Sequence, residues 1–231
     1  MSTTILSHLA RVAEPEKMTE EEESHYARAD YSVPHEAFAD DIVAAIGRDR
    51  EVSLADLGTG PGDVPIRLRS KVDWNLWGVD LSAGMLGIAV EDAASRLAPS
   101  ARPINWVIAD IKRTGLPAQQ FDAVISNSVL HHLEDALKFW REVARIGKPG
   151  SFVHVRDLRR PESEADADRL TALHVGEESP VVQEHYRSSL LSAYRPEEVE
   201  QQLADAGLHG LQVRPLDDRY LEVVGWRRDS A

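Results

Sequence analysis

The spacing of apolar positions changes at about residue 50. From about His35 to Ile46 apolar residues recur at helical spacing, which predicts a helix that stops at Gly47. Thr19 precedes four glutamates, and acidic residues suit the first turn of a helix, so another helix is predicted to begin there. Beyond residue 50, short apolar runs alternate with helical patterns. This alternation predicts a parallel sheet with helices on both faces.

The predicted elements of this part can be placed along the chain. Strands are expected at 52–57, 74–79, 104–108, 121–126 and 151–156, and helices at 63–69, 82–96 and 134–146. By composition, 147–150 is predicted to be a turn. The strand signal lapses over 161–193, a polar stretch predicted to be helical. A helix beginning at Pro196 and two antiparallel strands, 210–215 and 220–226, are expected to close the chain.

Composition narrows the possible partners. The 231 residues include 26 Lys and Arg against 39 Asp and Glu, a net charge of −13, which disfavours nucleic acid as a partner. The chain has no cysteine, which excludes disulfides, thiolate metal sites and cysteine nucleophiles. We find no apolar run of membrane-spanning length and no signal-peptide pattern, so we expect a cytoplasmic protein that does not bind membranes.

A glycine-rich loop, Asp56-Leu-Gly-Thr-Gly-Pro-Gly62, follows the first predicted strand. Open α/β sheets bind ligands at this position, and Asp80, at the end of the second strand, can accept hydrogen bonds from both hydroxyls of a ribose. In a dinucleotide fingerprint the third glycine would stand where this chain has Asp63, which disfavours NAD or FAD. The loop lacks the Lys-Ser/Thr of a Walker-type site. The pattern therefore predicts a nucleoside site.

The loop resembles motif I of class I S-adenosylmethionine-dependent methyltransferases. Four further stretches continue the resemblance in order: Gly78-Val-Asp-Leu-Ser82, Ala109-Asp-Ile111, the strand 121–126 with the segment after it to His132, and Ile146-Gly-Lys-Pro-Gly150. The resemblance covers about residues 50–157, and His131-His132-Leu133 is most similar to quinone-biosynthesis and natural-product methyltransferases. It implies a Rossmann-like, seven-stranded, mostly parallel sheet with helices on both faces and a helical cap.

The resemblance also implies a set of cofactor residues. Backbone of Gly58, Gly60 and Asn127 would contact the methionine and ribose parts, Asp80 the ribose hydroxyls, and Asp110 the adenine amino group. The complete set is Asp56, Gly58, Thr59, Gly60, Asp80, Leu81, Met85, Asp110, Ile111 and Asn127. For Met85 a plain core role stays open, and for Asp110 a strand-end cap.

Candidate catalytic and acceptor residues follow the fourth strand and lie in the predicted cap. His131 or His132 could act as general base, because histidine titrates near neutrality; a capping or packing role is the alternative. Arg156 could bind an acidic acceptor or pair internally. The candidate acceptor residues are Tyr26, Tyr31, His35, Arg156, His185, Tyr186 and Tyr194. No histidine spacing indicates a metal site.

These observations give one functional hypothesis and two alternatives. We expect one structural domain: a cap segment at 1–48 and a methyltransferase unit at 49–231 with a helical insertion at about 161–194. It would transfer a methyl group from S-adenosyl-L-methionine to a small molecule by in-line displacement, leaving S-adenosyl-L-homocysteine, as a monomer or homodimer. The alternatives are a non-catalytic S-adenosylmethionine-binding sensor or partner subunit, and a nicotinamide-dependent oxidoreductase.

Overall fold

The computed structural model describes residues 9–15 and 31–228. The described elements are α2 (Ser32–Ile46), β1 (Ser53–Leu57), α3 (Asp63–Lys71), β2 (Asn75–Asp80), α4 (Ala83–Arg96), β3 (Asn105–Ile108), β4 (Phe121–Asn127), η1 (Leu130–His132), α5 (Ala136–Ile146), β5 (Gly147–Leu158), α6 (Glu164–Val175), α7 (Pro180–Ser192), α8 (Pro196–Asp205), β6 (His209–Pro215) and β7 (Tyr220–Arg228). Strands and helices alternate as the apolar pattern predicts.

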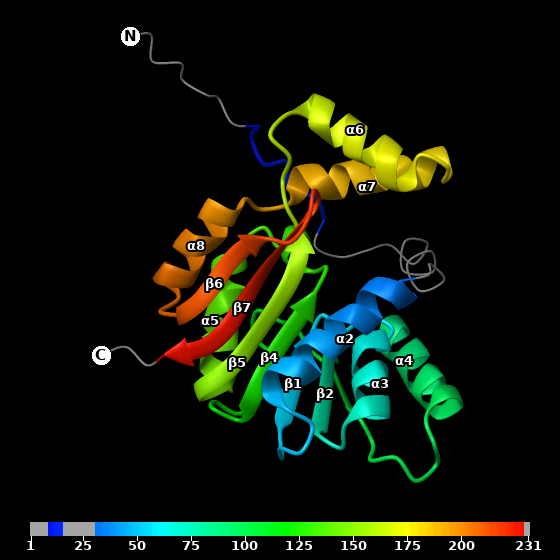
Figure 1. The fold of residues 1–231 in the computed structure, drawn as a ribbon, viewed down its shortest axis with the longest axis vertical. Coiled ribbons are helices and arrows are strands. Elements are labelled where there is room, and N and C mark those ends of the chain that lie inside the picture. Colours follow the sequence, from blue (N-terminus) through cyan, green and yellow to red (C-terminus); the bar gives the residue numbers. More distant parts are fainter. Residues whose placement is uncertain (1–8, 16–30, 229–231) are drawn as a thin grey trace.

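The seven strands form one sheet in the order β3-β2-β1-β4-β5-β7-β6 (Figure 1). Strands β1 to β5 run parallel, and β7 is antiparallel to both of its neighbours, β5 and β6. The predicted seven-stranded, mostly parallel sheet is therefore confirmed. The strand order reverses between β1 and β4, and open α/β sheets bind ligands beyond the carboxyl ends of the strands at such a point.

Apolar side chains on both faces of the sheet bind it to two helical layers. On one face Phe139 and Trp140 of α5 pack in a cluster with Val124 of β4, and α8 joins them. On the other face Phe38 of α2 packs in a cluster with Ile125 of β4, and α3 joins them. Neighbouring residues of β4 thus point to opposite faces, as the alternation of a strand requires. The result is a three-layer sandwich (Figure 1).

A separate helical pair, α6 and α7, lies beyond the carboxyl ends of β4 and β5 (Figure 1). Leu170 of α6 and Leu190 of α7 pack with Leu158, the last residue of β5. Residues 9–15 run beside α7, where the Val12 N–H donates to the Leu191 carbonyl at 3.1 Å. The cap over the sheet is thus built from the predicted insertion and residues 9–15, whereas α2, also within the expected cap segment 1–48, packs on the sheet.

The prediction of a turn at 147–150 is wrong, because β5 already begins at Gly147. Gly147 pairs with Phe121 and the next pair joins Phe152 to Ala123, so β5 advances five residues while β4 advances two. Gly150, with φ +74°, lies within this bulge. The glycines and proline therefore bend the strand without ending it. The helix start predicted at Thr19 lies outside the described residues.

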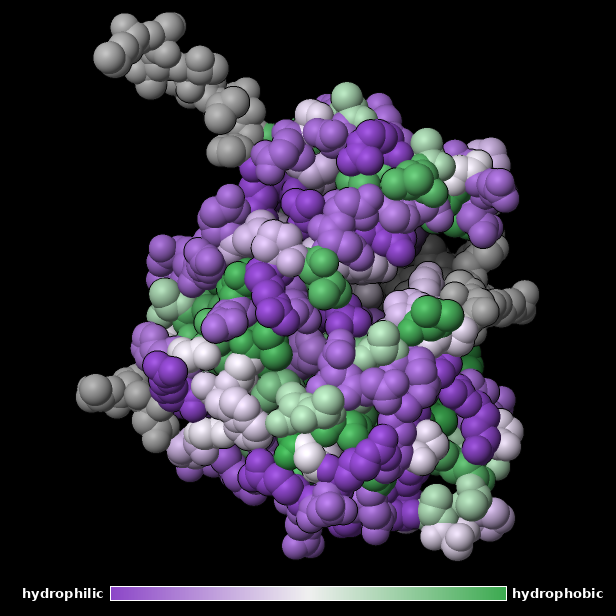
Figure 2. Space-filling view, viewed as in Figure 1, coloured by the Kyte–Doolittle hydropathy of each residue, from purple (hydrophilic) through white to green (hydrophobic). Residues whose placement is uncertain are grey.

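The surface is largely hydrophilic on the face viewed in Figure 2. Among the residues that the structure describes, no helix combines the length and apolar character needed to cross a bilayer.

Candidate functional site

The glycine-rich loop turns sharply from β1 into α3. Its three glycines all have positive φ: Gly58 at +74°, Gly60 at +54° and Gly62 at +78°. The N–H groups of Gly58 and Thr59 donate to the Val79 carbonyl of β2 at 2.8 and 3.0 Å. A Cβ on Gly58 would lie 2.4 Å from Cγ2 of Val129, so only glycine fits there. The loop consequently packs directly against the segment that leads into η1.

Asp80 ends β2 with both carboxylate oxygens held by the backbone. Oδ2 accepts the Gly60 N–H and Oδ1 accepts the Ser82 N–H, each at 2.8 Å. The N-cap of α4 is Ser82, whose Oγ accepts the Met85 N–H at 3.1 Å, so Asp80 is not the cap of that helix. Both oxygens of Asp80 are therefore held in fixed positions at the carboxyl end of β2, beside the glycine loop.

Asp56, in β1, stabilises the glycine-rich loop through a hydrogen bond. Its side chain is only 2% exposed, and its Oδ2 accepts the Thr59 hydroxyl at 2.7 Å. Burial raises the pKa of Asp56 to about 7; the Thr59 hydrogen bond lowers the pKa and the neighbouring Asp80 carboxylate raises it. Two residues that the sequence assigns to the cofactor, Asp56 and Thr59, are thus hydrogen-bonded to each other.

The remaining predicted cofactor residues lie along the same edge of the sheet. Met85 and Ile111 are buried, at 4% and 7% exposed, whereas Leu81, next to Asp80, is half exposed. Asn127 is the last residue of β4. The strand ends therefore bring together apolar and polar groups around the glycine loop.

Asp110 forms a local turn after β3. Its Oδ1 accepts the Lys112 N–H at 2.9 Å, and the Lys112 Nζ lies 3.3 Å from the same oxygen. The side chain is 43% exposed. Asp110 thus has the capping contact that the sequence left open, and its exposure leaves it accessible to a ligand.

The first histidine after β4, His131, is fixed by Asp157 at the end of β5. Asp157 Oδ1 lies 2.7 Å from Nδ1 of His131, and its Oδ2 accepts the N–H groups of Val129 and Leu130 at 2.7 and 2.6 Å. Burial lowers the pKa of His131, but the charge and hydrogen bond of Asp157 outweigh burial and raise it above its usual value. An imidazole that donates from Nδ1 presents Nε2 as its acceptor atom.

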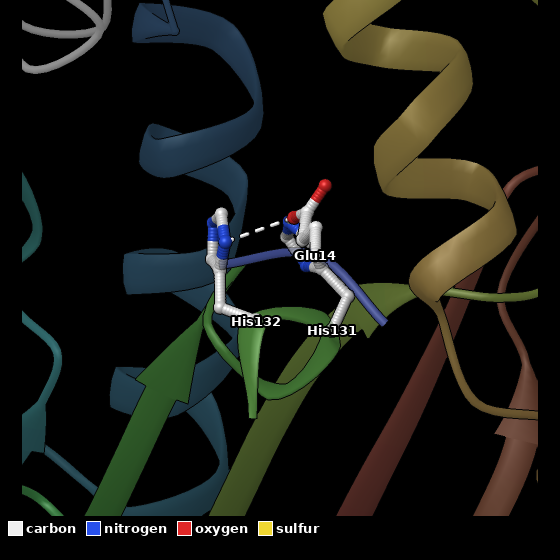
Figure 3. Close-up of side chains that lie close together, drawn as sticks. All are labelled: Glu14, His131 and His132. Atoms are coloured by element: carbon white, nitrogen blue, oxygen red, sulfur yellow. Dashed lines mark ion pairs between the residues drawn. The ribbon is translucent and has the colours of Figure 1, made fainter. Parts of the chain in front are cut away.

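Glu14 approaches both histidines from the chain segment at 9–15. Its Oε1 lies 2.8 Å from Nδ1 of His132 and 3.6 Å from Nε2 of His131, and Figure 3 shows all three side chains converging. Burial raises the pKa of Glu14, but His132, His131 and His185 outweigh burial and hold it below its usual value. Burial and the neighbouring His131 lower the pKa of His132. The arrangement forms a compact acid–imidazole cluster.

Arg11 anchors the segment that carries Glu14. Its Nη2 donates to the carbonyls of His131 and Leu133 at 3.0 and 2.9 Å, and its Nε donates to the Ser192 carbonyl at 2.5 Å. Its guanidinium also lies over the Tyr194 ring, 4.2 Å from the centroid. We call residues 9–15 the strap, because they join η1 to the end of α7.

Two predicted acceptor residues are instead paired with carboxylates within the chain. His35 Nδ1 lies 2.8 Å from Asp63, which links α2 to the first turn of α3. The Arg156 guanidinium lies 2.9 Å from Asp41 and packs over the Phe38 ring. The internal pairing that the sequence left open for Arg156 is thus the one observed.

The other predicted acceptor residues lie near the cap, apart from Tyr26, which is outside the described residues. The Tyr194 hydroxyl donates to the Leu133 carbonyl at 2.6 Å, so this residue ties the cap to η1. Tyr186 packs with the apolar side chains of α6, α7 and β5. Burial raises the pKa of Tyr31, with a further increase from Tyr220, and the Tyr31 ring stacks on His35 with 5.5 Å between the ring centroids.

The structure adds three residues to this site: Glu14, Asp157 and Tyr220. Asp157 could have been found from its place at the end of the fifth strand, beside Arg156. Tyr220 begins β7 and is paired with Leu158 at the end of β5. Glu14 carries no pattern in the sequence that links it to histidines so far along the chain.

Comparisons with known proteins agree with the fold. Residues 55–155 match a family model described as a methyltransferase domain. An uncharacterized methyltransferase of Mycobacterium tuberculosis is 35% identical over 102 residues, 44% of this chain and 48% of the relative. A 2-phytyl-1,4-naphtoquinone methyltransferase of Nostoc punctiforme is 32% identical over 110 residues, 47% of each chain. These matches span about half the length of the relatives.

A solved structure extends the likeness to the rest of the fold. The crystal structure of a SAM-dependent methyltransferase from Aquifex aeolicus superposes with a TM-score of 0.68 at 18% identity, covering 91% of this chain and 100% of that one. Residues 55–155 thus match a methyltransferase domain, and the described chain shares the fold of that SAM-dependent methyltransferase.

Proposed function

We propose that this protein is an enzyme that transfers a methyl group from S-adenosylmethionine to a small-molecule acceptor. The observation that carries the proposal is Asp80, whose carboxylate is held by two backbone N–H groups at the end of β2. A carboxylate fixed at the carboxyl end of the second strand of such a sheet is the group that accepts from the vicinal hydroxyls of a ribose. An acidic residue used only as a helix cap would not need both oxygens fixed in this way.

The residues around Asp80 fit the cofactor. In this proposal the backbone of Gly58, Gly60 and Asn127 contacts the methionine and ribose parts. Leu81, Met85 and Ile111 supply apolar surface for the adenine, and Asp110 accepts from its amino group, while Asp56 and Thr59 keep the loop in shape. When bound, the cofactor supplies a methyl group already activated by a positively charged sulfur.

The remaining task of the chain is to align the acceptor and exclude water. Good alignment alone is worth about 7–11 kcal/mol in such reactions. The strap, α6 and α7 lie beyond the carboxyl ends of β4 and β5, where they would keep water from the acceptor. His131 and His132 lie two and three residues beyond Val129, which contacts the glycine loop, so we place the acceptor next to this pair.

A small acceptor is supported by the cap and by charge. Tyr186 and Tyr220 pack against the apolar cluster of α6, α7 and β5, and aromatic side chains suit an enclosed pocket for a small, partly apolar molecule. The name of the Nostoc relative indicates a naphthoquinone as its substrate. The net charge of −13 opposes binding to a phosphate backbone. The expectations of a monomer or homodimer and of a cytoplasmic location remain predictions.

Acceptor screening tests the enzymatic part of this proposal. The chain would be incubated with S-adenosylmethionine and a panel of phenols, hydroquinones, amines and thiols, with formation of S-adenosylhomocysteine as the readout. Turnover of at least one class, abolished in H132A, supports the proposal. Cofactor binding without turnover across the panel would favour a sensor or partner subunit instead.

A further inference from the structure

The cluster of Glu14, His131 and His132 has more than the contacts of a simple ion pair. Nδ1 of His132 is buried and, among the residues that the structure describes, makes no hydrogen bond of acceptable geometry, although Glu14 Oε1 lies only 2.8 Å away. The two atoms therefore approach closely without pointing along a shared N–H bond. A hydrogen bond between these two atoms therefore does not account for their close approach.

The three donor atoms are spaced as ligands of one ion would be. They lie within 4.8 Å of one another, and the two separations to Glu14 are 2.8 and 3.6 Å. Atoms bound to one transition-metal ion at about 2.1 Å lie roughly 3–3.5 Å apart. Small side-chain adjustments therefore suffice to bring all three atoms onto a single ion (Figure 3).

The surroundings of His131 match the outer shell of a metal ligand. Its Nδ1 is paired with Asp157 at 2.7 Å, and Asp157 is in turn held by two backbone N–H groups. Metal-binding histidines almost always donate their second ring nitrogen to such a carboxylate, which fixes the ring and makes the free nitrogen a better donor. Nε2 of His131 is the nitrogen that faces Glu14.

The charges of the carboxylates near the cluster also favour a bound metal ion. Glu14 and Asp157 are two buried carboxylates, with side chains 7% and 1% exposed. The guanidinium of Arg11, on the same strap as Glu14, donates to the carbonyls of Ser192, His131 and Leu133 and to neither carboxylate. Buried charges need compensation, and a divalent cation would balance both acids.

We propose that Glu14, His131 and His132 bind a divalent first-row transition-metal ion, with Asp157 orienting His131. Two imidazoles and one carboxylate suit Zn²⁺, Fe²⁺ or Co²⁺, and three protein ligands leave a coordination position open. The role of the ion in the reaction rests on the proposed function. The ion would bind a hydroxyl of the acceptor and lower the pKa of that hydroxyl, and the hydroxyl proton would pass to solvent. The sequence alone predicts no metal here, because Glu14 joins the histidines only in the folded chain.

Cobalt titration tests the site without any turnover. The full-length, tag-free chain is treated with a chelator, dialysed and titrated with Co²⁺, with visible absorption as the readout. We expect saturation at one ion per chain and competition by Zn²⁺. E14Q should remove this binding, and D157N should weaken it about ten- to a hundredfold. H174Q is the matched control, because His174 also pairs with a carboxylate, that of Asp218, on the outside of the cap.

Each result of the Co²⁺ titration either supports or overturns the metal site. Wild-type affinity in E14Q, or no saturable Co²⁺ binding by the wild type, overturns the metal site. If E14Q does not fold, as judged by circular dichroism, H132Q replaces it under the same criteria. Calorimetric binding of S-adenosylhomocysteine is measured on the same samples. Cofactor binding without Co²⁺ binding refutes this inference alone, and Co²⁺ binding without cofactor binding refutes the proposed function alone.

Discussion

Asp56 and Asp80 lie close together, but their surroundings suit them to different roles. Asp56 is 2% exposed and accepts the hydroxyl of Thr59 in its own loop, whereas Asp80 is held by two backbone N–H groups at the end of β2. Asp56 is therefore equipped to brace the loop, and Asp80 to bind a ligand.

Replacing Asp80 by alanine tests its assignment to the ribose. Hydrogen bonds to a charged acceptor contribute about 1.5–3 kcal/mol each, and some of this is recovered by water, so D80A should weaken S-adenosylmethionine binding roughly 30- to 1000-fold. Calorimetry gives the affinity, and circular dichroism verifies the fold. D92N, an exposed carboxylate on α4, is the control and should bind like the wild type. Near-normal affinity in D80A would refute the ribose assignment.

At the scale of elements, Gly58 couples the glycine loop to η1. G58A should lower the free energy of unfolding by about 1–3 kcal/mol, because its Cβ would collide with Val129 and its φ is +74°. Urea denaturation measures the loss. In the double variant G58A/V129A the collision is relieved, so the loss should be smaller than the sum of the two single variants. Strict additivity would contradict the packing account.

The attachment of the strap to η1 and α7 is predicted to depend on Arg11. R11A loses the hydrogen bonds to the carbonyls of His131, Leu133 and Ser192. Amide exchange at Val12, whose N–H donates to Leu191, should consequently become about tenfold faster or more. Hydrogen exchange followed by mass spectrometry of a peptide that contains Val12 measures this. R48A, which removes an exposed contact to Lys71 far from the strap, should leave the rate unchanged.

Local patterns of apolar residues and glycines in the sequence predict the sheet and the nucleoside site. They do not predict the contacts that the cap makes. The strands of the core are short apolar runs, and the glycine loop and Asp80 lie where parallel strands end, so their grouping follows from topology. The bulge at 147–150 was missed because glycine and proline mark a bend without saying whether pairing continues through it. Arg11 and His131 are 120 residues apart, and no periodicity links the strap to η1.

At the scale of the whole molecule, Asp56 makes stability depend on pH. Burial raises its pKa to about 7 in the folded state, above the value near 4 of an unfolded chain, so between these values only the folded state keeps the proton. Stability from this group is therefore greatest at low pH and falls as the pH rises to 7, by on the order of 3 kcal/mol between pH 5 and 8.

The variant D56N isolates this contribution. Asparagine retains an acceptor for the Thr59 hydroxyl but does not titrate. The free energy of unfolding, measured by urea denaturation at several pH values, should fall less from pH 5 to 8 in D56N than in the wild type. Parallel pH profiles for the two proteins would show that Asp56 is not the group responsible.

We propose above all that this fold holds S-adenosylmethionine at the end of β2. The most direct test is calorimetric titration of the wild-type chain with S-adenosylmethionine and S-adenosylhomocysteine, beside NADH and NADPH. We predict saturable binding of the first pair at one molecule per chain, lost in D80A, and no binding of the nicotinamides. Binding of a nicotinamide cofactor in place of the first pair, or of neither pair, would contradict the account.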